Sequence, residues 1–292
     1  MAKTRGAIGF CLDFFVSFCI KAKRKSTNAQ QNNNMENVTT SGHAPVNGIN
    51  MYYEIRGSGT MPLVLIHGGG STIETSFGNI LPLLQGKIIA VELQAHGRTS
   101  DRDAPETFQQ DADDVAALLT YLNIDKANFL GFSNGATTTL QIAIRHPEIV
   151  NKIVSISGAY ERGGFIPGFF DGFKNATLSN MPQPLQDAFL KVTPDKDLLQ
   201  VMFDKDVQRM VNFKDIPEDD IKGIKAKALV IVNDKDVITA EHTVKIARII
   251  PNAGLVILPG THGTCIGEAG TTKKDSKPPL ITAGIIEDFL NE

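Results

Sequence analysis

The clearest chemical pattern in the sequence is a serine flanked by two glycines, the segment GFSNG at residues 131–135. It follows the apolar run 127–132 and precedes residues 134–145, which have the periodicity of a helix. Glycines two positions before and two after the serine allow a sharp bend from a strand into a helix, which presents the hydroxyl at the helix N-terminus. This placement predicts that Ser133 is a nucleophile rather than an ordinary turn serine.

A nucleophilic serine needs a base and an acid that orients the base. Of the six histidines, only His262 lies in a glycine-rich loop directly after the last expected strand. Sites of open α/β sheets gather at that edge, so His262 is the candidate base, and structural or solvent-exposed roles are expected for the other five. The acid is expected just beyond a strand end, where Asp234 and Asp236 are both candidates.

Strands and helices that could position these residues alternate along the chain. Several of the expected strands are continuous apolar runs, which is typical of parallel strands covered on both faces. The expected strands are 50–56, 62–67, 87–93, 127–132, 152–158, 228–233 and 254–259, and the expected helices are 106–122, 134–145, 240–250 and 280–290. The pattern predicts an α/β fold, a mostly parallel open sheet with helices on both faces.

One long segment interrupts this alternation. About seventy residues separate the strands at 152–158 and 228–233, which is more than a crossover needs. Residues 160–222 hold seven of the 16 phenylalanines and include helical stretches at 183–191 and 196–212. We expect this lid insertion (residues 160–222) to be helical, to bury one apolar face and to offer another to a ligand.

Together these motifs resemble those of the α/β-hydrolase fold family, from about residue 46 to the C-terminus. The resemblance implies that Ser133 is the nucleophile of a catalytic triad and that His262 is its base. The family's acid commonly stands fourth in a Gly-x-x-Asp turn, which favours Asp236. Because Asn233 replaces that glycine, Asp234 stays an alternative.

The resemblance also implies an oxyanion hole. The segment HGGG at residues 67–70 follows an early expected strand, as the family's oxyanion loop does. The backbone N–H groups of Gly69 and Asn134 are therefore expected to bind the developing oxyanion. Residues 92–99 resemble another family loop with departures at Glu92 and His96, and no chemistry is assigned to them.

The function implied by this resemblance is that of a serine hydrolase acting through an acyl-enzyme. The expected substrate is a small or medium carboxylic ester, lactone or related acyl compound. Other chemistries on the same triad stay open, namely C–C bond hydrolysis, perhydrolysis and N-terminal peptide cleavage. So does a hydrolase-fold ligand receptor with slow turnover.

Composition excludes several other classes. The 292 residues carry a net charge of −3, and positive charge gathers in the first 45 residues, so the remainder is acidic and poorly suited to nucleic acid. Three cysteines without metal-ligand spacing predict neither a disulfide framework nor a metal site, and no cofactor is expected. The expected partner is a small-molecule acyl substrate.

The N-terminal region has a different character. Residues 6–20 are mostly apolar, but they are too short to span a bilayer, contain Asp13 and lead into KAKRK without a cleavage site. We expect either a cytoplasmic protein with an extension that is dispensable over residues 1–34, or a leader that directs export or membrane anchoring. Residues 1–42 are interpreted as a leader and a polar linker, and 43–292 as the folded domain with its lid insertion.

Overall fold

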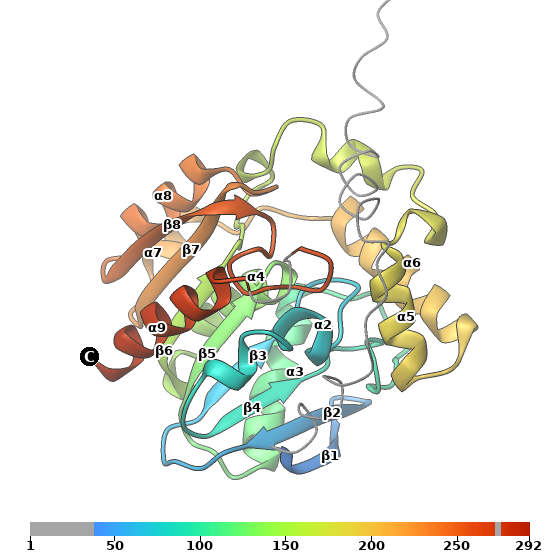
Figure 1. Ribbon diagram of the computed structural model, residues 1–292, viewed down its shortest axis with the longest axis horizontal. Coiled ribbons are helices and arrows are strands. Elements are labelled where there is room, and N and C mark those ends of the chain that lie inside the picture. The colour runs from blue at the N-terminus through green and yellow to red at the C-terminus, as the bar shows by residue number, and fades with distance from the viewer. Residues whose placement is uncertain (1–37, 272–275) are drawn as a thin grey trace, which may run out of the picture.

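Eight strands form one sheet in the part of the chain that the structure describes (Figure 1). The computed structural model describes residues 38–271 and 276–292, so the predictions for residues 1–34 lie outside it. The order across the sheet is β1-β2-β4-β3-β5-β6-β7-β8. The strands are β1 (Val38–Val46), β2 (Ile49–Arg56), β3 (Leu63–Ile66), β4 (Ile88–Val91), β5 (Ala127–Phe132), β6 (Val150–Ile156), β7 (Lys227–Lys235) and β8 (Ala253–Thr261).

The sheet is mostly parallel, as predicted. The pairs β1–β2 and β2–β4 are antiparallel, and every other neighbouring pair is parallel. Each of the seven expected strands is present, and β5 has the predicted bounds. Because parallel strands bring their carboxyl ends to one edge, the loops after β3, β5, β7 and β8 meet there.

The first strand, β1, is absent from the sequence-based prediction, which placed the start of the folded domain near His43. The structure corrects this start to Val38, because residues 38–42 of the expected linker belong to β1. The strand is an edge strand. Ala44 and Val46 are buried, whereas Thr40, Ser41, His43 and Pro45 are exposed, so this part of the strand carries little hydrophobic signal. Asn47 and Gly48, both with positive φ, form the tight turn that pairs it with β2.

Helices cover both faces of the sheet. Residues Val64 and Ile66 of β3 contact the core beneath α3, α4 and α8, whereas Leu63 and Leu65 contact the core beneath α2 and α9. The bounds are α2 (Ile73–Phe77), α3 (Phe108–Tyr121), α4 (Asn134–Arg145), α8 (Ala240–Ile249) and α9 (Pro278–Asn291), with 3₁₀ turns at Leu81–Leu83 and Pro147–Ile149. Within residues 38–271 and 276–292, no helix has both the length and the apolar character needed to cross a bilayer.

The lid insertion is helical, with two apolar clusters of its own. One cluster is rich in phenylalanine and joins the end of β7, and the other packs Met202 and Phe189 between α5 and α6. The elements are α5 (Gln183–Val192), α6 (Lys196–Val211) and α7 (Glu218–Lys222), preceded by 3₁₀ turns at Arg162–Gly164, Phe169–Phe173 and Leu178–Asn180. In Figure 1, α5 and α6 lie to one side of the sheet, whereas Ile221 of α7 packs into the main core.

Candidate active site

Ser133 stands on a strained turn between β5 and α4. Its backbone has φ 54° and ψ −120°, a conformation that a residue with a side chain adopts at a cost in free energy. The neighbouring glycines make the turn possible: a Cβ at Gly131 would lie 2.0 Å from the carbonyl oxygen of Gly135, and one at Gly135 would lie 2.1 Å from that of Ile66. The spacing of the motif therefore reflects steric need, and it fixes the serine where β5 ends.

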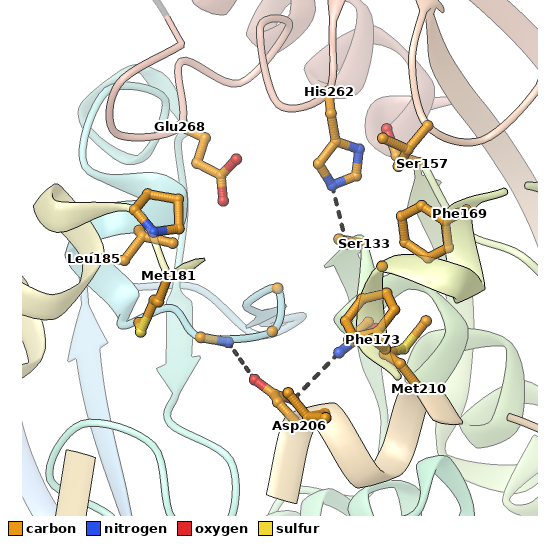
Figure 2. A pocket seen from close by; sticks show the side chains of 18 of the residues that line it. Ser133, Ser157, Phe169, Phe173, Met181, Leu185, Asp206, Met210, His262 and Glu268 are labelled. Carbon is orange, nitrogen blue, oxygen red and sulfur yellow. Dashed lines mark hydrogen bonds between the residues drawn. The ribbon is translucent and has the colours of Figure 1, made fainter. Parts of the chain in front are cut away.

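His262 joins Ser133 to Asp236 through hydrogen bonds. The His262 Nε2 lies 3.0 Å from the Ser133 hydroxyl oxygen (Figure 2). The His262 Nδ1 lies 2.7 Å from Asp236 Oδ1. A neutral imidazole in this setting carries its proton on Nδ1, donates it to the carboxylate and accepts the serine hydroxyl at Nε2. The three residues come from the ends of β5, β7 and β8. In the chain, His262 lies 129 positions after Ser133 and 26 positions after Asp236.

The structure distinguishes between the two candidate acids. Asp236 is buried, and it also accepts hydrogen bonds from the Ser157 hydroxyl at 2.7 Å and from the Ile238 N–H at 3.1 Å. Asp234 is exposed and instead accepts the backbone N–H of Gly260 at 2.8 Å. Asp236 thus holds the histidine ring in place, while Asp234 links the end of β7 to the end of β8.

The two titrating partners shift each other's pKa. Burial alone would raise the pKa of Asp236, but His262 and the donors Ser157 and Ile238 outweigh it and hold that pKa below its ordinary value. Burial alone would lower the pKa of His262, but Asp236 raises it above the usual 6.5. The carboxylate therefore stays ionised and favours a positive charge on the imidazole, which a base that accepts a proton requires.

The residues expected to form an oxyanion hole lie side by side. A Cβ at Gly69 would lie 2.5 Å from the Asn134 side-chain nitrogen, so the loop packs closely against the start of α4 and a larger residue would displace the Asn134 side chain. Among the described residues, neither the Gly69 N–H nor the Asn134 N–H donates a hydrogen bond to another group. Two free donors beside a serine hydroxyl are the arrangement that a developing oxyanion needs.

His67, which precedes these glycines, is structural as expected. Its Nδ1 donates to the Gly68 carbonyl at 2.7 Å and its Nε2 accepts the Leu93 N–H at 3.0 Å, and burial lowers its pKa to about 3. This neutral ring ties the oxyanion loop to the end of β4.

An apolar cavity of about 250 Å³ opens above Ser133 and His262. Strand-end loops form its floor, and the lid insertion forms most of its wall (Figure 2). The lid side chains that line it include Phe169, Phe173, Met181, Leu185, Met202 and Met210. The lid insertion therefore presents an apolar face to this cavity.

Three polar side chains at the site have no motif in the sequence. Glu268 points into the cavity near His262, and burial raises its pKa to about 7 (Figure 2). Ser157 bonds to Asp236, and Asp206 of α6 reaches the oxyanion loop. Only Asp206 carries a detectable signal, because it interrupts the buried stripe Met202–Asp206–Met210 at helical spacing, where an apolar residue is expected.

Two residues of the segment 92–99, to which the sequence assigned no chemistry, pair with charged side chains. Glu92 is structural, since it forms an ion pair with Arg98 at 2.7 Å. His96 is buried and lies 3.0 Å from Asp206 at the edge of the cavity. Among residues 38–271 and 276–292, no group of three or more His, Cys, Asp or Glu side chains is arranged to hold a metal ion.

Comparison with known proteins agrees with the resemblance to α/β hydrolases. The sequence profile described as alpha/beta hydrolase fold matches residues 61–194. The uncharacterized hydrolase YugF of Bacillus subtilis is 28% identical over 285 residues, which cover 88% of this chain and 100% of YugF. A meta-cleavage product hydrolase from Pseudomonas fluorescens superposes with a TM-score of 0.70 at 19% identity, over 87% of this chain and 98% of that one.

A third relative is the enol-lactonase from Burkholderia xenovorans, with a TM-score of 0.65 at 22% identity, over 86% of this chain and 100% of that one. The chain has the α/β-hydrolase fold, and its sequence resembles that family's profile over residues 61–194. The proteins it resembles are named as hydrolases or as a lactonase. The order of the candidate site residues along the chain agrees with this fold.

Proposed function

We propose that this protein is a serine hydrolase that cleaves a small or medium carboxylic ester, lactone or related acyl compound. The observation that carries the proposal is the continuous hydrogen-bonded series from Ser133 through His262 to Asp236, with distances of 3.0 and 2.7 Å. The strained turn at Ser133 supports it, because backbone strain is retained where a side chain must be presented in one direction.

The proposed reaction begins when the Ser133 hydroxyl oxygen attacks the carbonyl carbon and its proton passes to His262 Nε2. Asp236 stabilises the imidazolium, and the N–H groups of Gly69 and Asn134 bind the tetrahedral oxyanion. Collapse breaks the acyl–oxygen bond, and the leaving alkoxide takes the proton from Nε2. A water molecule then attacks the acyl carbon while His262 Nε2 takes its proton. The bond between the acyl carbon and Ser133 Oγ breaks, Nε2 returns the proton to Oγ, and the carboxylic acid leaves.

The cavity supports an apolar portion in the substrate. Its wall is built of phenylalanine, methionine and leucine from the lid insertion, and these side chains gain free energy when they bury apolar ligand surface. The similar structures named as an enol-lactonase and as a meta-cleavage product hydrolase are consistent with a hydrolase that acts on a lactone or related compound. We infer an uncharged ester or lactone from the apolar wall and the free oxyanion donors.

The variant Ser133→Ala tests this function. With p-nitrophenyl butyrate, we expect sustained turnover by the wild type and a loss of kcat on the order of 10⁴-fold or more in the variant, as in other triads. Labelling by a fluorophosphonate should disappear as well, while Tm is retained. The exposed Ser179 offers a matched control, so Ser179→Ala should keep both activities.

Two results would contradict the proposal. Labelling that persists in a folded Ser133→Ala protein would show that another residue is the nucleophile. A burst of one product per chain, with no further turnover on any ester or lactone, would favour a ligand receptor over an enzyme.

A further inference from the structure

Asp206 reaches from the lid helix α6 to both halves of the proposed oxyanion hole. Its Oδ2 accepts the backbone N–H of Gly70, the residue after Gly69, and its Oδ1 lies 3.4 Å from the side-chain nitrogen of Asn134 (Figure 2). A Cβ at Gly69 would lie 3.1 Å from Asp206 Oδ2, so the carboxylate packs directly on the loop. The Asp206 side chain thus contacts Gly70, which follows one of the two free N–H donors, and Asn134, which carries the other.

A carboxylate at this place raises an electrostatic problem. A negative charge beside the hole would repel the oxyanion that the hole must stabilise. The structure resolves this with His96, whose Nε2 lies 3.0 Å from Asp206 Oδ2 and whose Nδ1 lies 2.8 Å from the Gln94 carbonyl oxygen. Because a carboxylate and a carbonyl both only accept, each ring nitrogen must donate, so His96 is an imidazolium.

The charge on His96 agrees with its surroundings. Burial alone would lower the pKa of His96, but Asp206 outweighs it and, with Glu106, raises that pKa to about 9. The Gly70 N–H also lies 3.2 Å from His96 Nε2, but a protonated nitrogen cannot accept it, so the carboxylate is its acceptor. The charged and titratable groups that face His96 are Asp206 and Arg209 of α6, Glu106 before α3, Asp111 of α3 and His67 after β3.

A second ion pair holds α6 at this distance from the loop. Arg209, three residues after Asp206, lies 2.6 Å from Glu106 and 3.0 Å from Asp111, and all three side chains are buried. Buried charges with partners fix a relative position more sharply than apolar contacts do, because displacement leaves each charge unpaired. The docking of α6 on α3 therefore sets where the Asp206 carboxylate lies.

We propose that Asp206 is a positioning residue: the lid carboxylate, neutralised by His96, holds the loop at Gly70 and the start of α4 at Asn134 so that the Gly69 and Asn134 N–H groups converge on the reacting oxygen. This inference rests on the proposed function for its effect on rate. It makes the oxyanion hole depend on a lid that is docked on the body, so that the site is complete only when α6 is in place.

Variants at position 206 test the effect on rate. Asp206→Ala should lower kcat for p-nitrophenyl butyrate by about 10²-fold, the cost of misplacing one oxyanion donor, with a much smaller change in KM. Asp206→Asn keeps an acceptor for the Gly70 N–H and should recover part of the loss. The matched control is Asp204→Asn, the same charge change on the exposed side of α6, which should leave kcat unchanged. Unchanged kcat in folded Asp206→Ala would overturn the proposal.

A double variant separates positioning from a merely structural role. His96→Gln leaves the carboxylate of Asp206 without its cation beside the oxyanion, so kcat should fall. Adding Asp206→Asn removes the repelling charge, and the double variant should be faster than His96→Gln alone. If the two changes only add their losses, Asp206 serves stability and the positioning role is wrong.

The charge pairing can be tested without any substrate. In an NMR titration, the His96 ring should lose its proton near pH 9 in the wild type and at clearly lower pH in Asp206→Asn. A wild-type His96 that titrates at its ordinary value would overturn the inference. If the pairing holds but the wild type neither hydrolyses esters nor reacts with a fluorophosphonate, the proposed function fails instead.

Discussion

The body and the lid insertion contribute to the candidate site in different ways. Ser133, Asp236 and His262 stand at the carboxyl ends of β5, β7 and β8, and backbone hydrogen bonds of a parallel sheet hold those ends together. Asp206 and the apolar wall come from helices that pack on the body through two apolar clusters and a few buried charges. The sheet therefore positions the proposed reacting groups, and the lid lines the cavity around them and contacts the loop that we propose binds the oxyanion.

The two regions differ in the kinetic property that a substitution should change. A substitution on the sheet side removes a reacting group without altering the space, and we expect it to change kcat. A substitution on the apolar wall alters the space without touching the reacting atoms, and we expect it to change substrate selectivity. Asp206 lies in the lid insertion, but we expect its substitution to change kcat, as a substitution on the sheet side would. Asp206 therefore tests the difference between the two regions most directly.

The largest expected effect is a loss of kcat when Asp236, on the sheet side, is replaced. Asp236→Asn should lower kcat by about 10⁴-fold, because an amide favours the wrong tautomer of His262. Asp234→Asn should leave kcat close to that of the wild type, because Asp234 bonds to Gly260 instead, and its effect should fall on Tm. Measuring kcat and Tm for both variants tests the assignment, which a severe rate loss confined to Asp234→Asn would reverse.

An intermediate effect is expected on the lid side. Phe173 lines the cavity and packs on Phe169 with ring centroids 5.3 Å apart. Phe173→Ala removes apolar contact surface, so kcat/KM for a long-chain ester should fall about tenfold relative to a short-chain ester. Leu198→Ala, on the exposed side of α6, is the control. If Phe173→Ala lowers kcat/KM equally for long-chain and short-chain esters, Phe173 affects the reaction rate rather than substrate selectivity.

The smallest expected effect concerns pH and the carboxyl that faces His262. The base must be neutral, so kcat/KM should rise with pH through the pKa of His262, which lies above 6.5. Ionised Glu268 favours the imidazolium, and Glu268→Gln should therefore move this rise to lower pH. It should also remove an ionisation near pH 7 from the profile.

The control for Glu268→Gln is the exposed Glu241, whose change to Gln should leave the pH profile in place. A shift to higher pH in Glu268→Gln would contradict the electrostatic role. It would indicate that Glu268 acts as a hydrogen-bond donor to the substrate instead.

The sequence was informative wherever a local constraint had a chemical signature. The turn at Ser133 needs glycine at 131 and 135 because a Cβ at either place would collide with a carbonyl oxygen, so the motif is visible without a structure. Apolar runs located the interior strands. The edge strand β1 gave no such signal, because within residues 40–46 of this strand only Ala44 and Val46 are buried.

The choice between Asp234 and Asp236 shows where local reasoning stops. Both follow the same strand, two positions apart, and either could turn toward the histidine loop. The structure separates them through partners that are distant in sequence: Ser157 after β6 donates to Asp236, and Gly260 in β8 donates to Asp234. Such pairings depend on the order of strands in the sheet, which no single loop encodes.

The sequence by itself determined the fold class, the nucleophile candidate and the histidine candidate, because periodicity and steric limits on a turn act over a few residues. Only the tertiary structure decided that Asp206 of the lid meets Gly70 and His96, and that Glu268 faces His262. These contacts join residues as far apart as 136 positions, and their energies arise from burial and charge pairing that exist only after the lid insertion has packed on the body.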